Sequence, residues 1–101
     1  MKVIITEKAK RNLIDLFDYN AKISLDYALR MDKKIRAYIE TLQYFQYIGR
    51  YVPEIPSKQY RERICDKFRI IYFISEKENT IFVRYIIATR QNSNLLFEVN
   101  T

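Results

Sequence analysis

The apolar residues of this chain repeat with one period before Gly49 and with another after it. Between residue 7 and about residue 47 they recur every three or four positions, which places them on one face of an α-helix. From residue 60 onward the period is close to two, and aromatic and β-branched residues dominate, as is typical of β-strands. Because helices precede strands, this change of period predicts an α+β fold and limits the architecture more than any other feature.

Before Gly49 we expect a short strand over residues 2–5, at an edge of the sheet, followed by two helices. Thr6 and Ser24 are each suited to cap a helix, because their hydroxyls can accept hydrogen bonds from free backbone N–H groups. The second helix is predicted to run to about Tyr47, with Gly49 ending it at a C′ position. Its apolar stripe could pack in the domain's own core or form a coiled coil with a second copy, and the short length of the helix favours the core.

After Gly49 three strands are predicted over residues 60–64, 68–74 and 81–88. The polar segments 65–67 and 75–80 separate them and are suited to hairpin turns, so the strands form an antiparallel meander. We therefore predict a single domain over residues 1–101 of the α+β class. In it an N-terminal edge strand and an antiparallel helical hairpin pack on a twisted, mainly antiparallel β-sheet.

The charged residues and the single cysteine narrow the function. Lys and Arg number 18 against 12 Asp and Glu, so the net charge of +6 favours nucleic acid or an acidic protein as partner, with a merely basic surface as the alternative. Cys65 stands alone and there is no histidine, which argues against zinc sites and Cys/His chemistry; no metal or cofactor is expected. No apolar run has the length of a signal peptide or a membrane span, so we expect a cytoplasmic protein without a membrane partner.

Arginines recur inside the predicted strands or at their ends, namely Arg61, Arg63, Arg69, Arg84 and Arg90. Arg61 and Arg63 share a face, because alternate residues of a strand point the same way. One interpretation is structural, with each arginine paired to a carboxylate such as Glu62 or exposed to water. The other is that several guanidinium groups converge on one concave face of the sheet beside tyrosines, which suits phosphate binding and base stacking.

The segment GRYVPEIP, residues 49–56, holds the only glycine and both prolines of the chain. The prolines stiffen the backbone, so Arg50 and Glu54 could be held on a fixed path beside the sheet. Alternatively the segment only connects a helix to a strand, and both charged side chains are solvated.

Several motifs in a fixed order resemble the RelE/ParE superfamily of toxins from bacterial type II toxin–antitoxin systems. These motifs are the helix start Thr6-Glu7-x-Ala9, then Gly49-Arg50-x-Val52-Pro53-Glu54, Arg61-Glu62, Phe68-Arg69-Ile70-Ile71-Tyr72 and the final run from Val83 to Arg90. The resemblance spans nearly the whole chain and implies a compact toxin bound by an acidic cognate antitoxin. Residues 94–99 are apolar for a terminus and could pack on the core or form a flap for the antitoxin.

The resemblance implies one of two activities. RelE-like members enter the ribosomal A site and cut mRNA, whereas ParE-like members bind DNA gyrase and block replication without cutting nucleic acid. The basic charge and the arginines favour ribosome-dependent mRNA cleavage, while the FRIIY segment leans toward ParE. An inactive RNA-binding module of the same fold is the third alternative.

For cleavage, the resemblance implies a metal-independent endoribonuclease whose residues match family positions. Glu54 matches a general base, Arg61 and Arg69 match positions that stabilise the phosphate, and Arg90 is a further catalytic candidate. Weaker attraction for RNA is expected from Arg50, Lys58, Arg63 and Arg84. Some nucleases of the family carry a His or Tyr general acid near the end of the last strand, and residues 86–93 contain neither. The remaining candidates for a proton donor are Tyr60, Tyr72, Tyr85 and Lys58.

Overall fold

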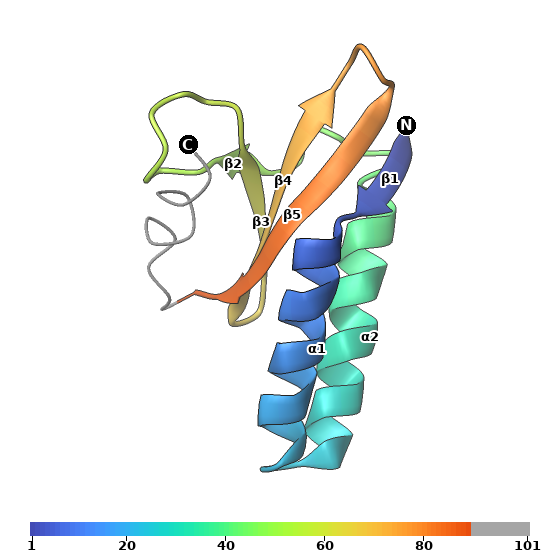
Figure 1. The fold of residues 1–101 in the computed structure, drawn as a ribbon, viewed down its shortest axis with the longest axis vertical. Coiled ribbons are helices and arrows are strands. Elements are labelled where there is room, and N and C mark those ends of the chain that lie inside the picture. The colour runs from blue at the N-terminus through green and yellow to red at the C-terminus, as the bar shows by residue number, and fades with distance from the viewer. Residues whose placement is uncertain (90–101) are drawn as a thin grey trace.

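In a computed structural model, which describes residues 1–89, two helices pack on one face of a five-stranded sheet (Figure 1). The elements in chain order are β1 (Lys2–Ile5), α1 (Glu7–Ala21), α2 (Leu25–Thr41), β2 (Arg50–Tyr51), β3 (Arg61–Cys65), β4 (Phe68–Ser75) and β5 (Thr80–Ala88). The sheet order is β1-β5-β4-β3-β2, with β1 parallel to β5 and every other pair antiparallel. The α+β class, the helical hairpin and the edge position of β1 are therefore confirmed.

Both predicted helix caps are present. The Thr6 hydroxyl accepts a hydrogen bond from the Ala9 N–H at 3.3 Å and donates one to the Val83 carbonyl at 2.9 Å. It thus caps α1 and ties the start of that helix to β5. The Ser24 hydroxyl accepts from the Tyr27 N–H at 3.2 Å at the start of α2. Such caps contribute about 1 kcal/mol each to stability.

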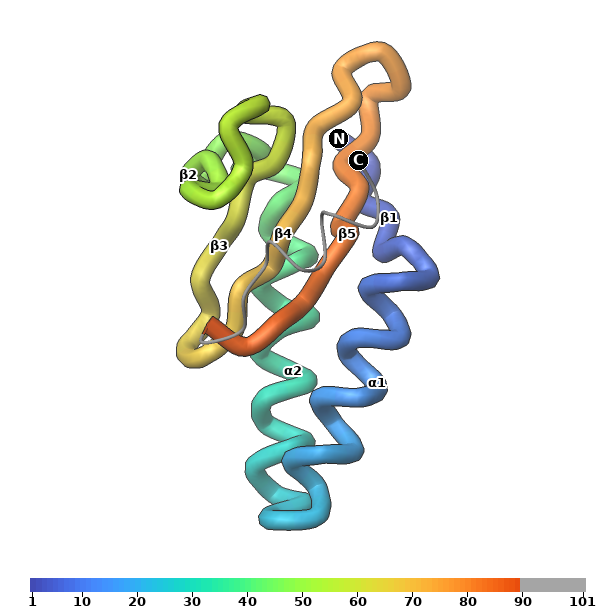
Figure 2. Tube along the Cα trace, turned by 60° about the vertical axis from the view of Figure 1, so that its left-hand side comes forward, coloured from blue at the N-terminus to red at the C-terminus, as the bar shows by residue number. Residues whose placement is uncertain are grey.

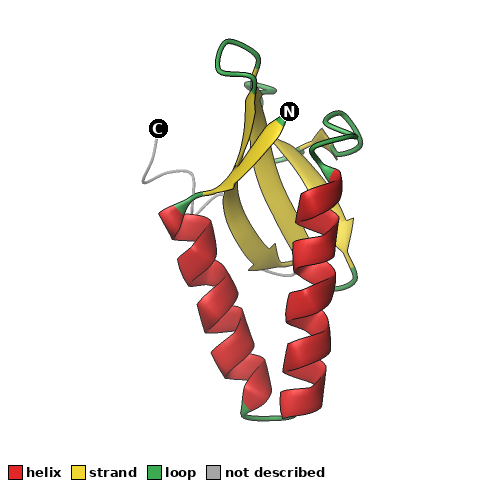
Figure 3. Ribbon diagram, turned by 90° about the vertical axis from the view of Figure 1, so that its right-hand side faces the viewer, coloured by secondary structure: helices red, strands yellow, loops and turns green. Residues whose placement is uncertain are grey.

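The helical hairpin covers one face of the sheet and extends past its end at the α1–α2 turn (Figures 2 and 3). The core lies between the helices and this inner face, where Leu13, Ile35, Ile70 and Ile86 are almost completely buried. The apolar stripe of α2 is used in this core, as expected. Within residues 1–89 neither helix is long and apolar enough to cross a membrane.

The end of α2 and the role of Gly49 differ from the prediction. The helix ends at Thr41 rather than near Tyr47, and turns follow it. Near its end the Tyr38 carbonyl accepts hydrogen bonds from two side chains, the Thr41 hydroxyl at 2.7 Å and the Arg63 guanidinium at 3.1 Å. Such side-chain bonds replace backbone bonds that would continue the helix. Gly49 is not a C′ residue and its φ is not positive.

Gly49 is instead required by a close approach. A Cβ atom there would lie 2.6 Å from the Glu62 carbonyl oxygen and 2.6 Å from the Tyr72 hydroxyl. The Gly49 N–H donates to that hydroxyl at 2.9 Å, and the hydroxyl donates to the Gln46 carbonyl at 2.8 Å. The missing side chain lets the chain turn into the two-residue strand β2, which the periodicity did not predict.

A bulge interrupts the pairing of β4 with β5. The register passes from Ile71–Tyr85 directly to Tyr72–Val83, so Arg84 has no partner on β4. A bulge adds one residue to its strand and changes the direction of the side chains around it. Arg84 consequently lies toward the outer face of the sheet, the face away from the helices, with its guanidinium carbon 5.8 Å from the Tyr85 ring centre.

Candidate functional site

Four charged residues form a network on the outer face, which we call the ion-pair network: Arg50, Glu54, Glu62 and Arg69. The Arg69 guanidinium donates to both Glu54 oxygens, at 2.7 and 2.9 Å, and its Nε donates to Glu62 Oε1 at 2.7 Å. The Glu62 side chain is fully buried, and its second oxygen accepts from Arg50 Nε at 2.7 Å. Two positive and two negative charges are therefore paired within one cluster.

Arg69 holds the segment between β2 and β3 against the sheet. Its side chain is only 8% exposed, yet its two carboxylate partners raise its pKa, the hydrogen bonds to Glu54 most of all, against the lowering effect of burial. On the same face Val52 packs with Ile71, Tyr85 and Ile87 in a second small core. Glu54 is thus a paired side chain in a packed segment, and the alternative in which it is solvated is wrong.

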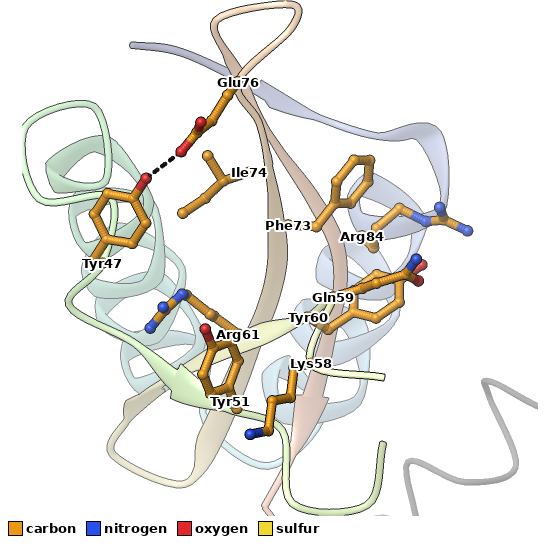
Figure 4. Close-up of a pocket in the computed structure, with 10 residues that line it drawn as sticks. All are labelled: Tyr47, Tyr51, Lys58, Gln59, Tyr60, Arg61, Phe73, Ile74, Glu76 and Arg84. Atoms are coloured by element: carbon orange, nitrogen blue, oxygen red, sulfur yellow. Dashed lines mark hydrogen bonds between the residues drawn. The ribbon is translucent and has the colours of Figure 1, made fainter. Parts of the chain in front are cut away.

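A second group of charged residues lines a cleft of about 500 Å³ at the side of β4, which we call the edge cleft (Figure 4). The pairing of β3 with β4 stops at Arg61–Tyr72, and the cleft lies beside the continuing part of β4. Its lining residues are Tyr47, Tyr51, Lys58, Gln59, Tyr60, Arg61, Phe73, Ile74, Glu76 and Arg84.

Among the described residues, the cations of the edge cleft lie near aromatic rings, and none of them forms an ion pair with a carboxylate. The Arg61 guanidinium carbon lies 4.3 Å from the Tyr51 ring centre and 5.1 Å from that of Tyr47, and its Nη1 donates to the Gly49 carbonyl at 2.8 Å. Arg84 lies 6.0 Å from the ring centre of Phe73. Within residues 1–89 neither arginine forms an ion pair.

Two further residues shape the edge cleft. Lys58 Nζ lies 5.9 Å from the Tyr51 ring centre, and the residue has a φ of 56°, a left-handed conformation that is uncommon for a side chain of this kind. Glu76 accepts a hydrogen bond from the Tyr47 hydroxyl at 2.7 Å, which raises the pKa of that tyrosine. The part of the lining that lies within residues 1–89 therefore contains three cations and one carboxylate.

Arg63 belongs to neither group. It points to the inner face, donates to the Tyr38 carbonyl and the Thr41 hydroxyl, and stacks on the Tyr38 ring at 4.1 Å. These contacts fasten the C-terminal end of α2 to β3.

A family model described as the ParE toxin of the type II toxin–antitoxin system parDE matches residues 3–93. The chain belongs to this toxin family. No curated protein sequence matches it.

Two solved structures share the fold of this ParE-family toxin. A chain of the chromosomal ParDE toxin–antitoxin system from P. aeruginosa superposes with a TM-score of 0.75 and 23% identity, covering 89% of this chain and 97% of that one. A chain of the toxin–antitoxin complex RelBE2 from Mycobacterium tuberculosis superposes with a TM-score of 0.55 and 14% identity, covering 86% and 95%. At these identities the likeness shows the fold alone.

The predicted site residues of this toxin lie in separate places. Glu54, Arg69 and Arg50 meet in the ion-pair network, whereas Arg61, Lys58 and Arg84 line the edge cleft. Arg90 and the apolar residues 94–99 lie outside the described residues. The expected convergence of the strand arginines on one face is wrong. Arg69 is the cross-strand partner of Ile64 and so shares the face of Glu62, while Arg61 and Arg63 point the other way.

Two aromatic residues of the site were not predicted: Tyr47 and Tyr51, which flank Gly49 and whose rings lie 5.1 and 4.3 Å from the Arg61 guanidinium. Among the proposed proton donors, Tyr72 is fully buried, and burial raises the pKa of its hydroxyl, which is bonded to Gly49 and Gln46. Tyr72 therefore has a structural position. Within residues 1–89 no three His, Cys, Asp or Glu side chains are grouped as a metal site.

Proposed function

We propose that this toxin inhibits DNA gyrase in the manner of ParE-like members, without cleaving nucleic acid. The observation that carries the proposal is the bidentate pair between Glu54 and the buried Arg69. We further propose that the toxin acts in the cytoplasm and that an acidic cognate antitoxin binds it, as the toxin–antitoxin complexes of its structural relatives suggest.

The pair counts against cleavage because of what that reaction requires. An RNA 2′-hydroxyl must lose its proton, a phosphorane must be stabilised, and the leaving 5′-oxygen must gain a proton. Glu54 is a poor base while both of its oxygens accept from a guanidinium, and Arg69 is a poor phosphate ligand while it donates to two carboxylates. Breaking a buried pair of this kind costs roughly 3–5 kcal/mol.

Ribosome-dependent mRNA cleavage remains the second candidate, because the cations and tyrosines of the edge cleft suit RNA. In that case Lys58, Arg61 and Arg84 would contact RNA, and the ion-pair network would have to open. The inactive RNA-binding module is the remaining alternative and predicts no growth arrest.

Two assays on the purified chain separate these candidates. In the first, gyrase supercoils a relaxed plasmid with and without the toxin; in the second, primer extension maps breaks in a defined mRNA during reconstituted translation. The proposal predicts loss of supercoiling and intact mRNA, and the toxin saturated with its antitoxin is the control that restores supercoiling. Ribosome-dependent breaks with unaffected gyrase would contradict it, as would inactivity in both assays together with normal growth on induction.

A further inference from the structure

We propose that the edge cleft binds an extended, acidic segment of a partner protein, which adds as a strand to the free edge of β4. The free edge consists of Phe73, Ile74 and Ser75, which follow the last β4 residue that pairs with β3. This interaction does not depend on whether the toxin acts on gyrase.

The backbone of β4 directs hydrogen-bonding groups out of the sheet at this edge. Val83 directs its carbonyl toward β1, where it accepts from the Thr6 N–H at 3.1 Å. Its cross-strand partner Tyr72 therefore directs its backbone groups toward β3, and by alternation Ile74 directs its own the same way. The pairing with β3 ends at Arg61–Tyr72, so within residues 1–89 no strand pairs with the Ile74 N–H and carbonyl. An unpaired edge of this kind is a template for a further strand.

The side chains of the edge cleft lie on both faces of the sheet around the free edge. Ile74 packs against the core beneath the helices, whereas Tyr60 packs with the second small core on the outer face. Successive side chains of an added strand also alternate between the two faces, so such a strand can contact both groups at once. Figure 4 shows the two groups on opposite sides of β4: Tyr47, Arg61 and Ile74 on one, and Tyr60, Phe73 and Arg84 on the other.

The charges of the cleft favour an acidic segment. Arg61 lies on the inner face and Arg84 toward the outer face, so each face contributes a cation, and Lys58 adds a third. Glu76, the one carboxylate of the lining within residues 1–89, accepts a hydrogen bond from Tyr47. Because consecutive residues of a strand point to opposite faces, two consecutive acidic residues would direct one carboxylate toward each arginine.

Exposed aromatic side chains favour a protein as the partner. Tyr47 and Tyr51 line the cleft and are exposed, as are Tyr44 and Phe45 in the same turn region after α2. Tyrosine and arginine together are typical of protein–protein interfaces and of the residues that contribute most to their affinity. We therefore expect apolar residues beside the acidic pair of the bound segment.

An NMR titration of isotope-labelled toxin with the peptide Thr-Val-Glu-Glu-Val-Thr tests the proposal. We expect saturable shifts of the Ile74 amide resonance and about tenfold slower hydrogen exchange of that amide in the saturated complex. The Lys58→Glu/Arg84→Glu variant should bind the peptide at least tenfold more weakly. A matched control, Lys8→Glu/Lys33→Glu, carries the same change of net charge at exposed positions outside the cleft and should change affinity by less than twofold.

Two N-methylated forms of the peptide separate strand addition from attraction between charges. Alternate N–H groups of an extended strand point to its two edges. One form carries methyl groups on the amides of one edge, and the other form carries them on the opposite edge. Only the edge that faces β4 pairs with it, so one form should bind about tenfold more weakly than the other.

Equal affinity of the two methylated forms would overturn the proposal, as would peptide binding that leaves the exchange of the Ile74 amide unchanged. Equal weakening by both double variants would show diffuse attraction to net charge and would also overturn it. So would absence of binding, or equally tight binding of a peptide with Lys-Lys in place of Glu-Glu. Displacement of the peptide by a lower concentration of oligo(dT) would assign the cleft to nucleic acid instead.

Discussion

The ion-pair network and the edge cleft lie on either side of the start of β3, and both are built from arginines that interrupt apolar strands. Arg69 is buried and bonded to two carboxylates, whereas Arg61 and Arg84 are partly exposed; Arg61 stacks on Tyr51, and Arg84 lies 6.0 Å from the Phe73 ring centre. The carboxylates make the difference, because Glu54 and Glu62 both turn toward Arg69. The same residue type in the same kind of element thus stabilises the fold in one place and remains available for a ligand in the other.

The largest difference in stability between the two regions is expected when Arg69 and Arg84 are each replaced by methionine. Arg69→Met leaves the Glu62 carboxylate buried with one partner fewer, so we expect a loss of about 3–5 kcal/mol in the free energy of unfolding. Arg84→Met, the matched control, removes no ion pair within residues 1–89 and should change stability by less than about 1 kcal/mol. Urea unfolding followed by circular dichroism measures both, and equal losses would contradict the distinction between the two regions.

Gly49 connects the two regions, since its carbonyl binds Arg61 and its Cα lies against the Glu62 backbone. Gly49→Ala forces a Cβ into contacts of 2.6 Å, so a loss of about 1–3 kcal/mol is expected from overpacking. Ile48→Ala, at the exposed neighbour, is the control and should have little effect. A Gly49→Ala variant as stable as the parent would show that this close approach is not needed.

The dependence of stability on alkaline pH tests the burial of the Tyr72 hydroxyl, which accepts a hydrogen bond from the Gly49 N–H. Burial raises the pKa of Tyr72 above its usual value of 10, and burial also raises the pKa of the Cys65 thiol above 9. Both groups deprotonate at lower pH in the unfolded chain than in the folded one, so stability should change little between pH 7 and about pH 9 and fall above that as these groups deprotonate. Unfolding midpoints measured from pH 7 to 11 should fall less steeply in Tyr72→Phe. An unchanged slope in that variant would count against the assignment.

The smallest effect is expected at an exposed ion pair. Lys34 binds Asp66 at 2.9 Å, and this bond raises the pKa of the lysine, but both side chains are largely solvated. Solvent screens such pairs, so the melting temperature of Lys34→Ala should not differ measurably from that of the parent. If Lys34→Ala lost nearly as much stability as Arg69→Met, burial would not explain which ion pairs stabilise this protein.

Local chemistry made much of the fold predictable. Interactions between residues close in sequence determine three features: the caps at Thr6 and Ser24, the core stripe of α2, and the strand pattern after residue 60. The end of α2 was not predictable, because Arg63, 22 residues beyond Thr41, takes part in ending it. The bulge at Arg84 was not predictable either, because it depends on the pairing of β5 with β4, and a period-two sequence pattern does not show where that register shifts.

The candidate site was predictable in its residues but not in its arrangement. Strand alternation placed Arg61 and Arg63 on one face, yet only the register of β3 with β4 shows that Arg69 faces the other way. Glu54 was singled out by its position in the proline-rich segment. That it meets Arg69 depends on how the segment folds back over the sheet, which no local pattern records.

Growth arrest by Glu54→Gln tests most directly the claim that the ion-pair network is structural. Glutamine keeps the shape of the side chain and an oxygen that accepts from Arg69, but it cannot serve as a general base. We predict that cells expressing this variant arrest as the parent does, with Glu40→Gln, at an exposed position on α2, as the matched control. Loss of arrest in a Glu54→Gln variant that still folds and binds its antitoxin would contradict the account and restore Glu54 as a catalytic base.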